Sequence, residues 1–493
     1  MYGNDITNVE KSDISKANVN FIQFDLAIAY FSVYLIKKIL IYNKNSAVYQ
    51  PIAEFYSGKS VLITGATGFL GKVFLEKLLY SCNKLDKVYL LVREKKAENV
   101  NKRIKDMFAN PLFSRLKKNN PDYLKQVVLV TGDMRLPNLG LSPTDEKTLI
   151  DKVSVVYHGA ATVRFNEPLP VAMNINFEGT QKILELSRRM KNIEAFLYIS
   201  TAFSQPQNKV IVETIYPSPA KLEDVYKFCE EYGHDTEETI KFINYHEKPN
   251  TYTFTKALSE SYIASHKGDV PTVIIRPSVV AAIKDEPLKG WIDNWMGATP
   301  YMFYTAKGWN RFNLGSSSQA ADFIPVDYVS NLSIIAGARA KRSNDVQVYN
   351  CTTSSDNPVT MSEVYKYFSE EIILRGKNHL PYPNLIFVKS KVILNIGTFF
   401  FQTTPAHIAD LWLKITGREP RYAKLVSQVL GMRKSYDFVT ANEKLMKAER
   451  GRELYTSLSP EDKQTFPCDV TQIQWSEYFR DYYKGVQRYL KPT

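Results

Sequence analysis

A glycine-rich turn between a predicted strand and a predicted helix constrains the fold of this chain more than any other feature. The turn runs Thr64-Gly65-Ala66-Thr67-Gly68-Phe69-Leu70-Gly71. It follows the short apolar run 61–64, and residues 69–79 have the apolar spacing of a helix. Glycines here let backbone amides approach an anion, and the helix N-terminus adds partial positive charge. The pattern predicts the first strand and helix of a dinucleotide-binding fold, in which this turn holds the pyrophosphate.

Strand and helix patterns continue to alternate along the middle of the chain. Apolar runs of strand length lie at 88–92, 127–131, 153–157, 196–199, 273–275 and 346–349, and a helical pattern lies at 180–190. Near-continuous apolar strands separated by helices are typical of a parallel sheet covered on both faces. The predicted fold class is therefore α/β, with a Rossmann-type doubly wound parallel sheet.

The length of 493 residues predicts more than one domain. Residues 1–55 are predicted as an N-terminal appendage, 56–377 as the α/β domain, and 378–493 as a mostly helical domain rich in Lys, Tyr and Phe. An apolar run in the last domain, 392–401, ends at Thr403-Thr404-Pro405. The proline-containing insertion 205–250 is either a substrate cover or a surface excursion without function.

A second motif, Tyr252-Thr253-Phe254-Thr255-Lys256, places a phenol and an ammonium one helical turn apart. An ammonium stabilises phenolate, so Lys256 is expected to lower the pKa of Tyr252 and to make the phenol a proton donor near neutral pH. Lys256 can also hold the nicotinamide ribose. This spacing is common by chance, and it gains weight from the glycine turn upstream. Together the two motifs predict a nicotinamide-dependent reductase with a tyrosine acid.

Two hydroxyl residues, Ser200 and Thr201, follow the predicted strand 196–199. The C-terminal edge of a parallel sheet faces the ligand crevice, so a hydroxyl there can donate a hydrogen bond to a carbonyl oxygen as negative charge develops. Thr201 is the first candidate for this role and Ser200 the second. His158 also ends a predicted strand, and we expect it to be structural.

Residues after the second and third predicted strands bear on the choice of cofactor. Arg93 follows the run 88–92, and Lys95 and Lys96 are next to it. A carboxylate at this place binds a ribose 2′-hydroxyl, whereas a cation accommodates a 2′-phosphate. The sequence therefore predicts NADPH rather than NADH, although Glu94 interrupts the basic run. Asp133, after 127–131, is predicted to lie near the adenine amino group.

The formal net charge is +12, and nine Lys and Arg residues against three acids lie between positions 93 and 118. Such a cluster fits nucleotide phosphates, coenzyme A or an anionic membrane surface, or is simply a solvated basic face. No zinc-finger, helix-turn-helix or ribonucleoprotein pattern occurs, so nucleic-acid binding is not predicted. The four cysteines are far apart and form no CxxC pair, which predicts neither a disulfide framework nor a metal site, in a reduced compartment.

The segment 21–42 contains an apolar core, 26–36, between Asp25 and the pair Lys37-Lys38. Eleven apolar residues are too few to span a bilayer, which takes about 20. The segment is predicted as an interfacial or docked amphipathic helix, with a full anchor over 21–42 as the alternative. We therefore expect membrane association on the cytosolic side.

Several longer stretches resemble the extended short-chain dehydrogenase/reductases, and more narrowly the alcohol-forming fatty acyl-CoA reductases of insect type. The matching stretches are FYSGKSVLITGATGFLGKVFLEKLL (55–79), HGAATVRF (158–165), NTYTFTKALSE (250–260), RPSVV (276–280), GWIDN (290–294), DFIPVDYV (322–329), GREPRYAKL (417–425) and 469–490. The resemblance covers about 55 to 490, nearly everything except the appendage.

The resemblance implies a Rossmann-type domain followed by a helical domain of the male-sterility type. Gly65, Gly68 and Gly71 then map to the cofactor-binding glycines, and Tyr252 and Lys256 map to the catalytic pair. Thr201, with Ser200 beside it, maps to the hydroxyl partner, and Pro277 joins the cofactor-binding residues. The implied reaction is the reduction of long-chain acyl-CoA to a primary alcohol with two NADPH, as in wax ester and ether lipid biosynthesis. The implied location is the endoplasmic reticulum rather than the peroxisome.

The chain departs from the pattern in three places. Gly297-Ala298 stands where Gly-Pro is usual, Gln402 stands where His is frequent, and the C-terminal end Tyr-Leu-Lys-Pro-Thr has no hydrophobic anchor. None of these removes the reductive chemistry. Two alternatives stay open at this point: a steroid or sugar-nucleotide dehydrogenase/epimerase with the same Tyr/Lys pair, and a non-catalytic lipid-binding scaffold.

Overall fold

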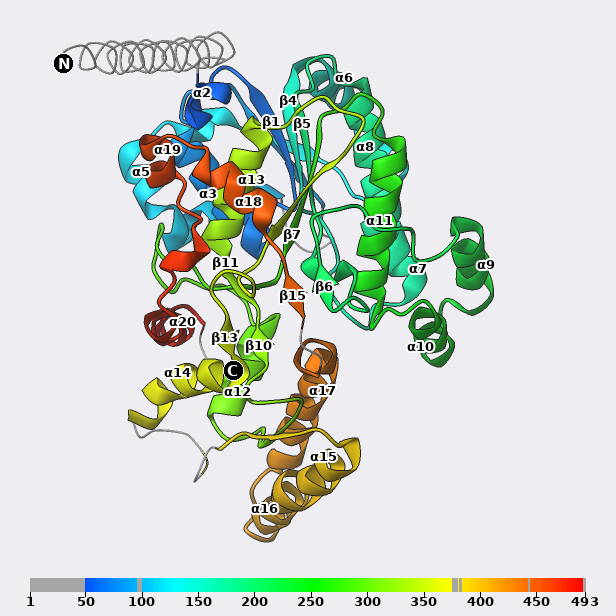
Figure 1. Cartoon of the computed structure of the whole chain (residues 1–493), viewed down its shortest axis with the longest axis vertical. Coiled ribbons are helices and arrows are strands. Elements are labelled where there is room, and N and C mark those ends of the chain that lie inside the picture. The colour runs from blue at the N-terminus through cyan, green and yellow to red at the C-terminus, as the bar shows by residue number, and fades with distance from the viewer. Residues whose placement is uncertain (1–48, 95–99, 375–379, 381–383, 442–443, 491–493) are drawn as a thin grey trace, which may run out of the picture. The chain divides into compact units, whose positions relative to one another are not determined.

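The computed structural model describes residues 49–94, 100–374, 380, 384–441 and 444–490 (Figure 1). The chain divides into two compact units, Met1–Pro51 and Ile52–Thr493. The apolar segment predicted at 21–42 and the lysines at 95 and 96 lie outside the described residues. All other candidate site residues belong to the second unit, which is described below.

Seven strands form the central sheet, in the order β12-β7-β5-β4-β1-β2-β3, and every neighbouring pair is parallel. The strands are β1 (Ser60–Thr64), β2 (Val88–Val92), β3 (Val127–Thr131), β4 (Val153–His158), β5 (Ala195–Ile199), β7 (Thr272–Pro277) and β12 (Gln347–Cys351). The order reverses at β1, which lies between β4 and β2. A doubly wound sheet binds its ligand at the carboxyl end of the strands at such a point. The predicted fold class is confirmed.

Helices cover both faces of the sheet (Figure 1). On one face α3 (Phe69–Ser81) packs against α13 (Val326–Ala338), over the side chains of Val61 and Ile63. On the other face α8 (Gly179–Arg189) and α11 (Thr251–His266) share a cluster with Leu62. Successive side chains of a strand point to opposite faces, so burial on both sides requires the continuous apolar runs seen in the sequence.

The insertion 205–250 contains the short strand β6 (Val210–Ile211) and two helices, α9 (Leu222–Tyr232) and α10 (Thr236–Tyr245). Its side chains Val225 and Ile243 are buried in one cluster with Phe254 of α11. The insertion is therefore attached to the helix that carries Tyr252.

The C-terminal part is mostly helical, as predicted. After β14 (Ile386–Val388), helix α15 (Lys391–Thr398), the π-helix η6 (Phe399–Thr403) and α16 (Thr404–Ile415) follow one another directly. Pro405 lies in the first turn of α16, where a missing N–H is tolerated, so the helical turns continue past the end of the apolar run. Helix α17 (Tyr422–Thr440) packs against α16.

The last elements pack back on the α/β part of the chain: they are α18 (Glu449–Thr456), α19 (Pro460–Thr465) and α20 (Trp475–Tyr489). Helix α20 packs against α14 (Met361–Leu374), and its Phe479 is fully buried in the largest hydrophobic core. Segments on both sides of position 377 thus share one core, and the domain boundaries 55/56 and 377/378 stay predictions. None of the helices in the described part of the chain is both long and apolar enough to cross a membrane.

Candidate active site

Helix α11 carries the Tyr252/Lys256 pair to the carboxyl end of β5. The side chain of Asn250 caps the helix by accepting a hydrogen bond from the backbone N–H of Thr253. Lys256 is buried, and its Nζ donates to the carbonyl oxygen of Ile199, the last residue of β5, at 2.6 Å. The same Nζ lies 4.5 Å from the ring centroid of Tyr198. These contacts fix the helix over the carboxyl-terminal edge of the sheet, next to Thr201.

Thr201 and Tyr252 meet at this edge. Their side chains are hydrogen-bonded, and Tyr252 keeps part of its surface exposed. Burial raises the pKa of Tyr252 well above its ordinary value, and the hydrogen bond with Thr201 opposes that shift. The phenol is thus protonated at neutral pH and can serve as a proton donor.

The expected influence of Lys256 on Tyr252 is corrected by this geometry. Burial lowers the pKa of Lys256 to about 7, and the negative charge of Glu260 opposes the shift. Near neutral pH the amine is thus only partly charged, and it is the Thr201 hydroxyl that lowers the pKa of the phenol. Lys256 lies one turn from Tyr252 as predicted, but its contacts are with Ile199 and Tyr198.

The second hydroxyl candidate, Ser200, belongs to a buried ionic network. Its Oγ donates to Glu260 Oε1, and Arg276 donates to the same carboxylate at 2.9 Å and 2.7 Å. The side chains of Arg276 and Glu260 are 0% and 1% exposed. Ser200 therefore ties the end of β5 to α11 and β7, and Thr201 is the hydroxyl that is paired with Tyr252.

The strand register connects the glycine turn to the Tyr/Lys helix. Thr64, His158 and Tyr198 are Cα partners across β1, β4 and β5. Two inter-strand spacings, about 10 Å, thus separate the start of the turn from Tyr198, over whose ring Lys256 lies. The candidate cofactor turn and the candidate acid therefore lie at the same carboxyl-terminal edge of the sheet.

His158 has the structural role that was expected. It is fully buried, with Nδ1 2.7 Å from Thr64 Oγ1 and Nε2 3.0 Å from Thr180 Oγ1. Burial, reinforced by the charge of Lys256, lowers its pKa to about 3, so the ring is neutral. His158 therefore links the end of β4 to the end of β1 and to α8.

The glycine turn fits the diphosphate of a dinucleotide. Gly65 has φ +77°, and a Cβ on it would lie 2.8 Å from the backbone nitrogen of Ala160. A Cβ on Gly71 would overlap the carbonyl oxygen of Gly65, so only glycine lets α3 start this close to the turn. Gly68 caps α3 without any side-chain hydrogen bond, which leaves the first N–H groups of the helix to a ligand.

The remaining residues of the turn differ in how far their side chains are buried. The Thr64 hydroxyl is buried and accepts from the Ala160 N–H at 3.2 Å, whereas Thr67, Gly68, Phe69 and Leu70 are exposed in full or in part. Phe69 stacks on Trp291 of the GWIDN stretch, with ring centroids 5.6 Å apart. The exposed part of the turn thus adjoins a stretch that the sequence had marked only by resemblance.

Arg93 and Asp133 lie on neighbouring strand ends, since Val92 and Thr131 are Cα partners in β2 and β3. Burial alone would raise the pKa of Asp133, but hydrogen bonds and charge from Arg135, and the charge of Arg93, lower it. Arg103 donates to the carbonyl oxygen of Arg93 at 2.9 Å. Three guanidinium groups thus gather there, of which the sequence had singled out Arg93. Pro277 ends β7, in register with Cys351.

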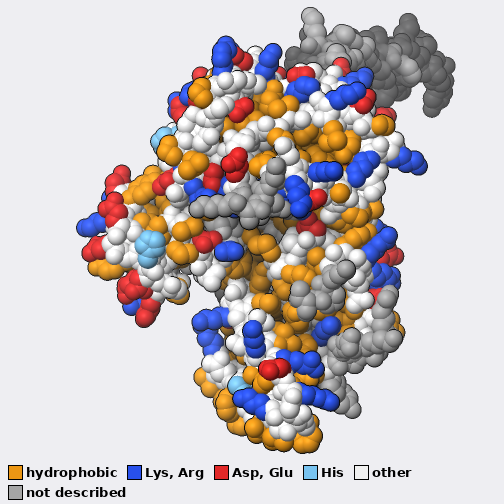
Figure 2. Space-filling view, turned by 180° about the vertical axis from the view of Figure 1, so that it is seen from behind, with side chains coloured by type: hydrophobic (Ala, Val, Ile, Leu, Met, Phe, Trp, Pro, Cys, Tyr) orange, Lys and Arg blue, Asp and Glu red, His pale blue; other side chains and the backbone are white. Residues whose placement is uncertain are grey.

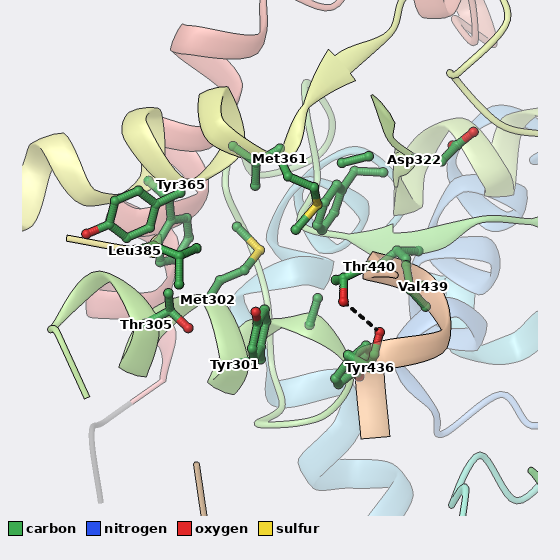
Figure 3. A pocket seen from close by; sticks show the side chains of 16 residues that line it. Tyr301, Met302, Thr305, Asp322, Met361, Tyr365, Leu385, Tyr436, Val439 and Thr440 are labelled. Atoms are coloured by element: carbon green, nitrogen blue, oxygen red, sulfur yellow. Dashed lines mark hydrogen bonds between the residues drawn. The ribbon is translucent and has the colours of Figure 1, made fainter. Parts of the chain in front are cut away.

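Figure 3 shows a cavity that is lined mainly by apolar side chains. It is bounded by α12 (Ala298–Ala306), α14, α17 and the residues around Ala321 and Leu385. The ring of Phe165 lies 6.1 Å from that of Tyr252 and 5.8 Å from that of Tyr436, which lines the cavity. The sequence did not predict this cavity, because its walls come from separate segments spread between Val279 and Thr440.

Comparisons with known proteins agree with this geometry. Two family models, both described as male sterility protein, match residues 63–333 and 401–491. Fatty acyl-CoA reductase 1 of Rattus norvegicus is 37% identical over 445 residues, which is 89% of this chain and 86% of the relative. The chain belongs to the fatty acyl-CoA reductase family. Fatty acyl-CoA reductase 2 of Bos taurus is 34% identical over 458 residues, with the same coverage of both chains.

Solved structures agree with the fold of this reductase. The terminal R domain from the myxalamid PKS-NRPS biosynthetic pathway has a TM-score of 0.58 and 20% identity, and covers 88% of this chain and 91% of its own. The reductase domain of a nonribosomal peptide synthetase from Mycobacterium tuberculosis has a TM-score of 0.54 and 18% identity, with coverage of 87% and 91%. The predicted family, fold and nicotinamide cofactor are thereby confirmed, and the family excludes the epimerase alternative.

Proposed function

We propose that this reductase converts long-chain acyl-CoA to a primary alcohol and free coenzyme A, with two NADPH and an aldehyde held between the two reductions. One observation carries the proposal. The ring of Phe165 contacts both Tyr252, which is paired with Thr201, and Tyr436, which lines the apolar cavity, so the two hydroxyls lie close to that cavity. An acyl chain in that cavity would present its thioester carbonyl to both hydroxyls. Thr201, Tyr252 and Lys256 are all present, which argues against a non-catalytic scaffold.

The hydroxyl groups supply the electrophilic assistance in this mechanism. Thr201 and Tyr252 donate hydrogen bonds to the thioester oxygen as negative charge develops on it. Bound NADPH would lie along the glycine turn, with its ribose near Lys256. It would supply one hydride, which is a proton with two electrons, in each reduction. When the C–S bond of the first adduct breaks, the thiolate leaves as coenzyme A and the carbonyl of the aldehyde forms. In the second reduction Tyr252 gives its proton to the aldehyde oxygen, which becomes the alcohol.

The preference for NADPH is argued from the cluster at the ends of β2 and β3. Arg93 follows β2 and Arg103 is hydrogen-bonded to its carbonyl oxygen, which supports the proposal because a cation after the second strand accommodates a ribose 2′-phosphate. We expect Arg93→Asp to lower the ratio of kcat/KM for NADPH to that for NADH at least ~10-fold, because a carboxylate repels the phosphate and accepts from a 2′-hydroxyl. The matched control is Arg188→Asp, on the exposed end of α8, which should leave the ratio unchanged. An unchanged ratio in Arg93→Asp would assign the specificity to other residues.

The test of the reaction is incubation of the full chain with NADPH and acyl-CoAs of increasing length, followed by mass spectrometry of the products. We expect primary alcohol and free coenzyme A, with two NADPH oxidised for each alcohol formed. Accumulation of free aldehyde at one NADPH per acyl-CoA would contradict the retained intermediate. No oxidation of NADPH with any acyl-CoA would contradict the proposed function.

The same assay tests the cavity with Val439→Phe. Val439 lines the cavity from α17 and is half-buried, so a ring there narrows the space without replacing a fully buried side chain. We expect kcat/KM for the longest substrates to fall at least ~10-fold more than for the shortest, which is the scale for losing a few buried methylenes. Leu430→Phe, half-buried on the same helix but away from the cavity, is the matched control.

A further inference from the structure

One segment of the C-terminal part exposes an apolar face without any covering element among the described residues. The segment is Lys391–Ile415, made of α15, η6 and α16 in direct succession. Ten of the 25 large apolar side chains that are exposed in the described residues belong to it, each between 54% and 71% exposed. They are Val392, Ile393, Ile396, Phe399, Phe400, Phe401, Ile408, Leu411, Trp412 and Ile415. We call this set the apolar face.

Helical geometry keeps these side chains on one side. The buried residues of the segment recur every three or four positions and pack toward α17 and β9 (Phe312–Leu314). Together with Gly397, they are Leu394, Thr398, Gln402, Ala406, Asp410 and Leu413. The Gln402 amide donates to Trp309 and accepts from the Arg311 N–H, and the Asp410 carboxylate accepts three N–H groups at the start of α17. The polar side chains among these buried residues are thus bonded inward, and the ten apolar side chains lie on the solvent side of the segment, where Asn395 and His407 are also exposed.

Basic side chains border the apolar face. Figure 2 shows apolar side chains along the lower end of the view, with Lys and Arg next to them. Between 386 and 424 there are six Lys and Arg residues and two acids, and one of these acids is the buried Asp410. The six are Lys389, Lys391, Lys414, Arg418, Arg421 and Lys424, and all six are exposed.

We propose that the apolar face docks on an anionic phospholipid bilayer and lies in its interface. Soluble monomers rarely expose a large group of neighbouring apolar side chains, whereas ten side chains of this one segment are each more than half exposed. A helix with aromatic and aliphatic residues on one side and Lys/Arg along the border binds in the plane of a membrane, with its apolar side about 5–10 Å deep. The positive border favours lipid headgroups over a second copy of this chain, whose own border has the same charge.

The docked position also relates the bilayer to the cavity. Helix α17 packs against α16 near its start and lines the cavity with Tyr436, Val439 and Thr440 near its end. Ten residues from Val426 to Tyr436 span about 15 Å of helix. The docking itself does not depend on the reaction proposed above, because it is measured without substrate.

The experiment is co-sedimentation of the full chain with vesicles of phosphatidylcholine containing about 30 mol% phosphatidylserine. We expect the triple variant Phe400→Ser, Trp412→Ser, Ile415→Ser to bind at least ~10-fold more weakly than the unchanged chain. Lys414→Glu with Arg418→Glu should weaken binding to these vesicles but not to phosphatidylcholine alone. The matched control is Ile240→Ser, since Ile240 is 55% exposed on α10 and lies outside the apolar face.

A second readout locates the contact. Trp412 is 66% exposed, so vesicles should shift its fluorescence emission to shorter wavelength, and Trp412→Phe should abolish the shift while keeping most of the binding. Unchanged sedimentation of a normally folded triple variant would overturn the proposal, because the contact would then lie elsewhere. Conversion of a dimer to a monomer by the same substitutions, in the absence of vesicles, would also overturn it, because a second copy would then be the occupant.

Discussion

Replacing Tyr252 with Phe is expected to lower alcohol formation at least ~100-fold, the usual scale for the loss of a general acid. The phenol is hydrogen-bonded to Thr201 and its pKa is raised by burial, so at neutral pH it holds the proton that the aldehyde oxygen must receive. Phe keeps the ring and its contact with Phe165, whose centroid is 6.1 Å away. The measurement is the rate of alcohol formation from acyl-CoA at saturating NADPH.

Binding of NADPH should survive this substitution, because the glycine turn and Lys256 are untouched. Quenching of intrinsic fluorescence by the cofactor gives the dissociation constant, and it should change less than threefold. The matched control is Tyr245→Phe, which removes a hydroxyl from a ring that is 82% exposed on α10. Alcohol formation within a few-fold of the unchanged chain would show that another group donates the proton.

The substitution Thr201→Val tests whether the hydroxyls of Thr201 and Tyr252 act on the same carbonyl oxygen. If the two hydroxyls act on one carbonyl oxygen, the losses from Tyr252→Phe and Thr201→Val should not add, since each removes part of the same interaction. Thr201 also accepts from the N–H of Phe203 at 3.2 Å, so its replacement perturbs the following turn. Tyr252→Phe is therefore the cleaner measurement, and the double variant reports the coupling.

The sheet could be predicted from the sequence because its strands are buried on both faces. Val88–Val92 was predicted with the bounds that the structure has, since all five of its side chains are buried. Val127–Thr131 was also predicted with its observed bounds, although it ends the strand order and is mostly half-buried. The glycine turn was predictable for a different reason: Gly65 and Gly71 are positions where any Cβ collides with backbone. Both signals lie in short stretches of sequence, and both can be recognised without knowing which other segments pack against them.

The parts that were not predicted depend on contacts between distant segments. The cavity joins residues near 300, 321, 365, 385 and 439, and no local pattern marks them as one site. The apolar run 392–401 was visible in the sequence, but it was expected to end at Thr403-Thr404-Pro405, and which side the longer helical segment exposes follows only from its packing on α17. The partner of Ser200 was missed in the same way, because the sequence did not mark Glu260 as lying next to it. The one available signal was Glu260 itself, an acid four residues after Lys256 and so on the same face of the helix.

Replacing Arg276 with Met is expected to cost about 3–5 kcal/mol of unfolding free energy, the scale for leaving a buried charge unpaired. Arg276 is fully buried and donates to Glu260, to the carbonyl oxygen of Val212 at 3.1 Å and to that of Thr214 at 2.8 Å. Its loss removes the ion-pair partner of Glu260, whose carboxylate keeps the hydrogen bonds from Ser200 and Ser204 and the weaker influence of Lys256. The measurement is urea unfolding of the full chain followed by tryptophan fluorescence.

The control for Arg276→Met is the double variant Glu260→Gln with Arg276→Met, which removes both charges. Replacing a buried ion pair by neutral groups of similar size often costs little, so the double variant should regain a large part of the stability lost in Arg276→Met. This outcome would mean that the pair orients rather than stabilises: it joins β7, α11, the end of β5 and the insertion, and so sets the position of the helix that carries Tyr252. If the double variant were as unstable as the single one, the loss would come from the unbonded carbonyl groups of Val212 and Thr214, and the network would be a clamp on the insertion.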